Sequence, residues 1–306
     1  MRTILNLNEE QIAPLLDWPS LITVLRSALV AYSTGRAANP VRQIVPVPAY
    51  EAFFGLMPAI FDGITGAKLV TAYPNNATYR LPTHMGLILL FREATGEPLA
   101  VLDARLITEM RTAAVSAIAT ELLAKPGAQV LGILGSGVQA RAHLRALTLG
   151  RPYERVYVWS RNPQHAGRFA EETGAITTSA EEAVQEADVI VTATHSPEPV
   201  VSGKWLKPDV HINAVGAVGP ARRELDSVAV EQAAVIVESR EAAENEAGDI
   251  LIPKVSIYAE LGELLAGTRP LPETRRTVYK SLGIGIEDIA AAKLVYERGT
   301  KVTSDG

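Results

Sequence analysis

A glycine-rich string stands between an apolar segment (130–134) and a segment with helical periodicity (138–149): Gly135-Ser136-Gly137-Val138-Gln139-Ala140. A G-x-G-x-x-A pattern in this setting is typical of the first βα turn of a Rossmann domain. Gly135 permits the tight turn, Gly137 lets the backbone approach a pyrophosphate, and Ala140 allows close packing of helix on strand. The amino end of the helix favours phosphates. We therefore predict a dinucleotide site, with a glycine turn that serves packing alone as the alternative.

The chain after residue 108 alternates apolar runs with helical patterns, as parallel sheets require. The expected strands are 130–134, 156–159, 189–193, 210–215, 235–237 and 277–281, and the expected helices are 138–149, 164–172 and 180–186. This alternation predicts a doubly wound α/β fold.

The first third of the chain has a different pattern. It carries short β-type runs at 43–47, 53–57, 67–72 and 85–91, punctuated by Pro, Gly and Asn. A helix with Asp17 as its N-cap precedes them. This part is expected to be α+β with an antiparallel sheet.

Length and composition limit the remaining options. A chain of 306 residues exceeds the roughly 250 to 300 residues at which single cores stop growing, so we expect two domains. The net charge of -5, without a basic tract, argues against a nucleic-acid partner. The lack of cysteine excludes thiolate catalysis and the common zinc sites, so no metal is predicted. Residues 1–7 show no export signal, and no apolar stretch is long enough for a membrane span, so we expect a cytoplasmic protein without membrane attachment.

The tip of the second Rossmann strand bears on the choice of dinucleotide. An acidic residue there normally accepts from the 2'-hydroxyl of NAD. This chain instead has Ser160, Arg161 and Asn162, and Arg161 offers a planar fork for a 2'-phosphate. NADP(H) is favoured, with NAD(H) as the alternative if Arg161 is simply solvated.

Four further residues are singled out by their settings. Arg111 is expected near the start of an Ala-rich helix at 113–124, where a cation opposes the helix dipole. An anionic ligand would explain that placement, and so would a surface salt bridge with Glu109 or Glu121. Lys68, Arg42 and His84 would by themselves be ordinary surface or hydrogen-bonded residues.

Several strings together resemble the ornithine cyclodeaminase and μ-crystallin family along nearly the whole chain. The strings are Val41-Arg42-Gln43-Ile44-Val45-Pro46, Gly55-Leu56-Met57-Pro58, Ala67-Lys68-Leu69-Val70-Thr71, Met110-Arg111-Thr112-Ala113-Ala114-Val115-Ser116-Ala117, Gly135-Ser136-Gly137-Val138-Gln139-Ala140, Ile212-Asn213-Ala214-Val215-Gly216 and Lys280-Ser281-Leu282-Gly283.

The resemblance implies a homodimer with two domains. An α+β domain for substrate binding and dimerisation would comprise residues 1–118 with a returning carboxy-terminal helix at 285–306, and an NAD(P)-binding Rossmann domain would comprise residues 119–284. The resemblance also implies two sets of site residues. Those at the substrate are Arg42, Met57, Lys68, His84, Arg111 and Val218, with Lys68 and Arg111 as the catalytic pair. Those at the cofactor are Gly135, Ser136, Gly137, Val138, Gln139, Ser160, Arg161, Asn162, Thr194, Val215 and Ser281.

One departure from the family pattern concerns the reaction. Ornithine cyclodeaminases have the pattern Gly-Gly-Asp-x-Pro after the Asn-Ala-Val strand, and here Val218 occupies the position of that acid. A valine can neither accept a proton nor hold an ammonium group, which argues against cyclodeamination by that route. The sequence is more similar to the μ-crystallin and ketimine reductase branch.

We therefore predict an NADPH-dependent reductase of a C=N bond beside a carboxylate, acting on a cyclic ketimine or a 2-imino acid. Arg42 and Arg111 would pin the carboxylate, while Lys68 would either contact it or assist protonation. The alternatives are a cyclodeaminase-type lyase with bound NAD, an amino-acid dehydrogenase of the alanine type, and a non-catalytic binder of a small ligand.

Overall fold

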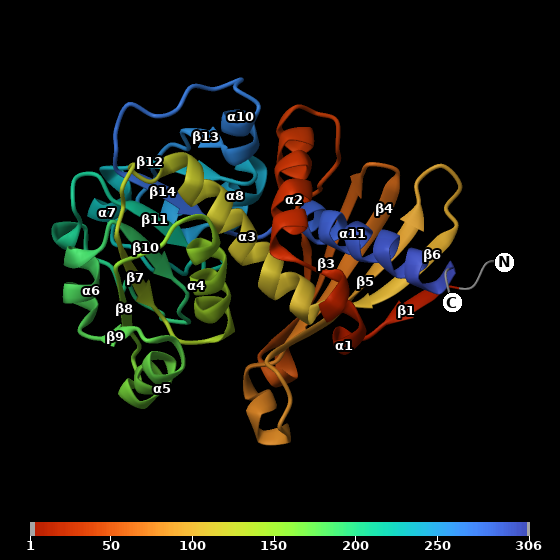
Figure 1. The fold of residues 1–306 in the computed structure, drawn as a ribbon, viewed down its shortest axis with the longest axis horizontal. Coiled ribbons are helices and arrows are strands. Elements are labelled where there is room, and N and C mark those ends of the chain that lie inside the picture. Colours follow the sequence, from red (N-terminus) through yellow and green to blue (C-terminus); the bar gives the residue numbers. More distant parts are fainter. Residues whose placement is uncertain (1–3, 305–306) are drawn as a thin grey trace. The chain divides into compact units, whose positions relative to one another are not determined.

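The structure, a computed structural model, describes residues 4–304. The chain forms two compact units (Figure 1). The first unit comprises the residues up to Arg111 together with those from Gly283 onward, and the second comprises Thr112–Leu282. Helix α3 (Arg105–Leu123) runs through the first boundary without a break. We expected divisions after residues 118 and 284, and the units divide after Arg111 and Leu282.

The first unit contains a six-stranded sheet. Its order is β1 (Leu5–Leu7), β6 (Pro98–Asp103), β5 (His84–Arg92), β4 (Ile64–Ala72), β3 (Ala52–Phe61) and β2 (Gln43–Val47). The pairs from β2 to β6 are antiparallel, which confirms the expected sheet. The parallel edge strand β1 and strand β6 were not predicted.

One face of this sheet is covered by helices. Helix α11 (Gly285–Ser304) packs on β3, β4 and β5 and against α2 (Trp18–Ser33), as Figure 1 shows. Helix α2 begins as predicted, because the Asp17 side chain accepts from the Ser20 N–H. Strand alternation puts Met57, Lys68 and Ile88 on the covered face. The shorter elements of this unit are α1 (Glu9–Ile12), η1 (Ala13–Leu15), η2 (Pro48–Tyr50) and η3 (Pro74–Tyr79).

The second unit contains an eight-stranded sheet in which every pair is parallel. Its order is β13 (Ala259–Glu260), β12 (Ala234–Val237), β14 (Thr277–Lys280), β11 (His211–Ala214), β10 (Val189–Thr192), β7 (Val130–Leu134), β8 (Arg155–Trp159) and β9 (Ile176–Thr177). Strand order reverses between β7 and β10, the switch point at which doubly wound sheets bind ligands.

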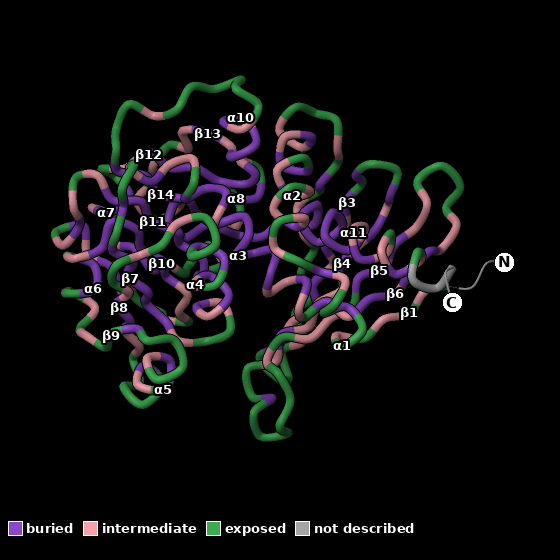
Figure 2. The backbone as a smooth tube through the Cα atoms, in the orientation of Figure 1, coloured by how far each residue is buried: buried purple, intermediate pink, exposed green. Residues whose placement is uncertain are grey.

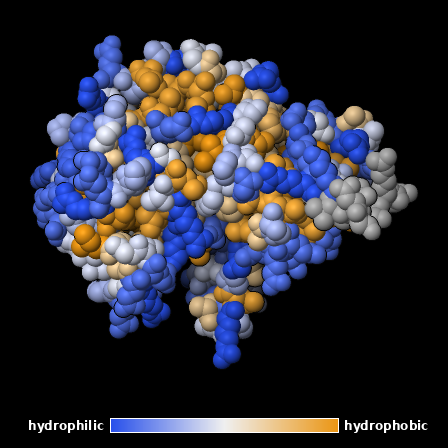
Figure 3. Space-filling view, in the orientation of Figure 1, coloured by the Kyte–Doolittle hydropathy of each residue, from blue (hydrophilic) through white to orange (hydrophobic). Residues whose placement is uncertain are grey.

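Helices surround this sheet. They are α4 (Val138–Gly150), α5 (Pro163–Thr173), α6 (Ala180–Glu186), α7 (Ser227–Glu231), α8 (Arg240–Glu246), α9 (Gly248–Leu251) and α10 (Leu261–Leu265), with a short turn at η4 (Gly203–Trp205). The central strands are buried (Figure 2), and mostly hydrophilic surface covers α5 (Figure 3). Ile133, Val191 and Phe169 belong to the core between β7, β10 and α5. Within residues 4–304, no helix is long and apolar enough to cross a membrane.

Candidate functional site

A buried group of charges lies in the first unit, where β4, α3 and α11 meet. Asp288, in the first turn of α11, contacts two of the predicted cations. Its Oδ2 lies 2.8 Å from Lys68 Nζ, and its Oδ1 accepts from Arg111 Nε at 3.0 Å. Glu287 accepts from Arg111 Nη1. The structure thus brings Lys68 and Arg111 together through Asp288.

The register of β4 determines which face of the sheet the Lys68 side chain occupies. It pairs with Met57 on β3 and Ile88 on β5, so its side chain enters the face that α11 covers and is 3% exposed. Burial lowers the pKa of Lys68 to about 8, with Asp288 opposing this effect and the Arg111 cation adding to it. An amine with such a pKa exchanges protons readily near neutral pH.

The expected position of Arg111 at a helix start was wrong. Helix α3 begins at Arg105, whose N–H donates to the Asp103 side chain, so Arg111 lies in the second turn, beyond the reach of the helix dipole. The expected alternative of a surface ion pair does not hold either. Arg111 is 4% exposed and pairs with Glu287 and Asp288 from α11.

Arg42 approaches the same group of charges from the segment before β2. It is half-buried, its Nη2 donates to the Gly283 carbonyl at 2.9 Å, and its charge lowers the pKa of Lys68. Met57 is buried beside Lys68. His84, the first residue of β5, pairs with Ala72 and is exposed. The three predicted cations therefore share one region of the first unit.

The sequence reasoning missed Glu287 and Asp288. A signal for Asp288 was present, because it shares one face of α11 with Ala291, Ala292 and Val295, all buried. An ionised acid on a buried apolar helix face must be paired with a cation, because an unpaired buried charge is strongly unfavourable. Lys68 and Arg111 are its partners here.

The glycine string forms the turn between β7 and α4 in the second unit. Gly135 has a φ of +117°, and a Cβ there would overlap the Ala193 carbonyl, so only glycine fits. A Cβ on Gly137 would meet open space. Gly137 caps α4 without a side-chain hydrogen bond, and Ser136 is half-buried while Val138 is exposed. This turn has room for a phosphate and leaves the helix N–H groups for it.

A second observation that indicates a ligand site concerns the side chain of Gln139. Its buried Oε1, in the first turn of α4, has no hydrogen-bond partner among the residues that the structure describes. An orphaned acceptor beside an open glycine turn fits a dinucleotide whose ribose hydroxyls can donate to it.

The predicted residues for the 2' position follow β8. Ser160 is half-buried, Arg161 is exposed, and Asn162 caps α5 by accepting from the Gln164 N–H at 3.0 Å. None of these three positions carries a carboxylate, and Arg161 directly precedes the N-cap of an 11-residue helix. Both groups favour an anion.

The other predicted cofactor residues lie at the carboxyl edge of the same sheet. The Thr194 N–H and hydroxyl both donate to Glu224 Oε1, and the Ser281 hydroxyl donates to Glu238. Val215 follows β11 and is buried. Both hydroxyls therefore donate to buried carboxylates, Glu224 and Glu238, in this structure. These two acids were not predicted from the sequence.

The loop with Val218 follows β11. Lys280, fully buried, donates to the Ala217 carbonyl and lies 2.9 Å from Asp249. Val218 itself is 39% exposed. The nearby Glu224 is fully buried and accepts four hydrogen bonds, including one from the Gly216 N–H. These four donors occupy both oxygens of the Glu224 carboxylate.

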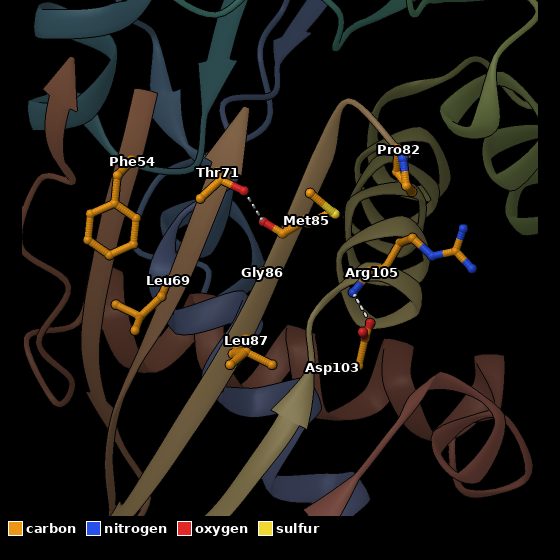
Figure 4. A pocket seen from close by; sticks show the side chains of 9 residues that line it. All are labelled: Phe54, Leu69, Thr71, Pro82, Met85, Gly86, Leu87, Asp103 and Arg105. Atoms are coloured by element: carbon orange, nitrogen blue, oxygen red, sulfur yellow. Dashed lines mark hydrogen bonds between the residues drawn. The ribbon is translucent and has the colours of Figure 1, made fainter. Parts of the chain in front are cut away.

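A pocket of about 530 Å³ lies elsewhere in the first unit. Phe54, Leu69 and Leu87 line it, with Arg105 at its side (Figure 4). Leu69 alternates with Lys68 along β4, so this pocket opens on the sheet face opposite the charges. It is part of an apolar open face and holds none of the predicted substrate residues.

Comparison with known proteins identifies the family of the chain. The profile of the Ornithine cyclodeaminase/mu-crystallin family matches residues 4–302. Ketimine reductase mu-crystallin of Mus musculus is 46% identical over 286 residues, covering 90% of this chain and 91% of that protein.

Two solved structures match nearly the whole chain. Thermococcus litoralis Delta(1)-pyrroline-2-carboxylate reductase, in complex with NADH and L-proline, is 36% identical, with a TM-score of 0.93 and 98% of each chain covered. An archaeal alanine dehydrogenase dimer with bound NAD is 31% identical, with a TM-score of 0.93 and coverage of 98% of this chain and 97% of that one. The relatives include reductases of C=N bonds, and the chain belongs to the ornithine cyclodeaminase/mu-crystallin family.

Proposed function

We propose that this chain is an NADPH-dependent reductase that reduces the C=N bond of a cyclic imine bearing a 2-carboxylate. The observation that carries the proposal is the buried group of Lys68 and Arg111 with Arg42 nearby. The net charge of the three cations and of the carboxylates Glu287 and Asp288 is +1. One substrate carboxylate would neutralise it. The family relatives that reduce ketimine and pyrroline-2-carboxylate support this substrate class.

Each residue has a role in this scheme. Arg42 and Arg111 bind and orient the carboxylate, which fixes the position of the imine carbon beside Lys68. Lys68 donates a proton to the imine nitrogen, as its lowered pKa allows. The dinucleotide, when bound, supplies the hydride. The product gains one hydride at carbon and one proton at nitrogen.

NADPH is the proposed form of the dinucleotide. The glycine turn and the amino end of α4 would hold the pyrophosphate, and Arg161 with the amino end of α5 would hold the 2'-phosphate. The relatives in complex with NADH and NAD make NADH the competing form.

We further propose that the chain is a homodimer. The open face of the first unit's sheet carries exposed Val45, Phe54 and Leu87, an apolar group that a second copy would cover. The related alanine dehydrogenase is a dimer.

The reaction itself is tested by following oxidation of NADPH and NADH with five- and six-membered cyclic imine 2-carboxylates. The same protein is incubated with L-ornithine and catalytic NAD, and proline and ammonia are measured. We expect imine reduction without proline formation, because Val218 replaces the acid of the cyclodeaminases. Proline at a rate comparable to imine reduction would favour the lyase instead.

A further inference from the structure

Asp288 stands between the two residues assigned to catalysis. One oxygen contacts Lys68 and the other accepts from Arg111, and the Asp288 side chain is fully buried. Helix α11 is fixed at this point by a further contact, in which the Ile286 N–H donates to the Asn39 side chain at 2.8 Å. The carboxylate is therefore held in place before any substrate arrives.

We propose that Asp288 is a positioning residue for imine reduction, which sets the separation of Lys68 and Arg111 and retains the proton on Lys68 until the substrate binds. The inference rests on the reductase function proposed above. Its physical basis is that one rigid carboxylate engages two different cations with separate oxygens.

Among the charged groups that affect the pKa of Lys68, Asp288 is the one that keeps the amine protonated. The charged groups around it are Asp288 on α11 and the cations Arg111 on α3 and Arg42 before β2. Its neighbours on the flanking strands, Met57 and Ile88, are apolar. Burial and the two arginines all favour the neutral amine, and Asp288 opposes them.

Stability alone is a poor explanation for this arrangement. A buried ion pair loses much of its Coulomb energy to desolvation, and apolar residues of similar volume often serve stability as well. A bridging carboxylate contributes something that apolar packing cannot, namely a defined proton on Lys68 and a fixed direction for the Arg111 guanidinium.

The first test is the titration of Lys68 itself, followed by NMR of protein with ¹³C-labelled lysine and assigned with Lys68→Met. We expect the wild-type midpoint near pH 8 and a midpoint at least one pH unit lower in Asp288→Asn. Glu287→Gln is the matched variant, because it removes one buried charge from the same helix turn but leaves the contact to Lys68. Its shift should be smaller. Equal midpoints in wild type and Asp288→Asn would overturn the inference.

The second test is kinetic. With a cyclic imine 2-carboxylate, Asp288→Asn should lower kcat/KM roughly 100-fold at pH 7.5 and move the alkaline limb of the pH profile downward. The dissociation constant for NADPH should stay within about twofold, because the cofactor turn belongs to the second unit. Lys293→Gln removes the ion pair that links α11 to Asp62, together with a pair to Glu297 within the helix, and controls for helix attachment. It should leave the pH profile unchanged.

A conservative variant covers the case in which Asp288→Asn does not fold. Asp288→Glu keeps the charge but displaces it, so we expect an unmoved pH limb and a kcat at least tenfold lower. Wild-type kinetics in Asp288→Glu would refute the positioning role. If wild-type protein reduces no imine while its Lys68 titration still depends on Asp288, the reductase assignment fails and the electrostatic role stands.

Discussion

Gly283 lies directly against the guanidinium of Arg111, so that a Cβ at this position would overlap both terminal nitrogens. The backbone of Gly283 also has a φ of +69°, and its carbonyl accepts from Arg42. Gly283 thus leaves space for the guanidinium of Arg111 and accepts a hydrogen bond from Arg42, the other arginine predicted to bind the carboxylate.

Gly283→Ala should therefore impair imine binding. We expect kcat/KM to fall at least tenfold, mainly through KM, with little change in NADPH affinity, because Arg111 must move away. Gly63→Ala is the control, since Gly63 has a φ of +79° in the same unit but open space around its Cβ. It carries the same backbone cost of about 1 to 2 kcal/mol. Similar KM values in the two variants would contradict the role of the Gly283–Arg111 contact.

The pH dependence of reduction should report Lys68. Because kcat/KM reflects the free enzyme, it should decline as pH rises through about 8, where Lys68 loses its proton. In kcat the limb should lie at higher pH, since the bound substrate carboxylate favours the charged amine. Lys68→Arg separates the two roles of Lys68. Loss of the limb with retained kcat would indicate a carboxylate anchor, and loss of kcat would indicate proton transfer.

Arg161→Ala should weaken NADPH binding by roughly one to two decades and leave NADH binding nearly unchanged, because a charged hydrogen bond contributes ~1.5 to 3 kcal/mol. Arg168→Ala removes another exposed arginine of α5 and serves as the control. Fluorescence titration with both cofactors measures the effect. Equal losses for NADPH and NADH would exclude the 2'-phosphate contact.

Leu87→Arg should dissociate the proposed dimer. Leu87 is 46% exposed on the open sheet face, and a charge there would be desolvated against the second copy. Light scattering should give twice 32.8 kDa for wild type and 32.8 kDa for the variant. Lys301→Glu, an exposed change on α11, should keep the wild-type mass. A wild-type monomer with full activity would rule out an obligatory dimer.

His143 should make the second unit sensitive to acid. Its Nδ1 donates to the Gln139 carbonyl, its Nε2 lies 2.9 Å from the Ser116 hydroxyl, and burial lowers its pKa from 6.5 to about 4. The unfolded chain takes up the proton first, so stability falls as pH drops from 6.5 to about 4, by about 3 kcal/mol in full. Denaturant unfolding at several pH values should show a smaller loss in His143→Gln. His165→Gln, at an exposed position on α5, should behave as wild type.

Local patterns explain what could be predicted from the sequence. The turn at Gly135 and Gly137 depends on neighbours within one βα unit, so strand, turn and helix could be placed from a few residues. The N-cap at Asp17 is similarly local. Helix α3 was placed too late, because its cap, Asp103, ends a strand that carries no strong signal of its own.

Long-range contacts explain what could not be predicted. Arg111 and Asp288 are 177 residues apart, and their contact depends on the docking of α11 in the first unit. The sequence identified the cations as candidates, but their counter-charges required the fold. The same holds for Glu224, whose four donors come from the ends of β10 and β11.

Helix α11 belongs to the first unit although the whole second unit precedes it in the chain. During synthesis, Lys68 and Arg111 leave the ribosome long before the two carboxylates that neutralise them. Until α11 is synthesised, the sheet of the first unit lacks the helix that packs on it, and Lys68 and Arg111 lack their two carboxylates. The second unit is contiguous in sequence and can already fold. A nascent chain of this protein therefore depends on late closure of its first unit, and ribosome-bound chains that stop before Gly285 should be captured by chaperones that bind apolar surface.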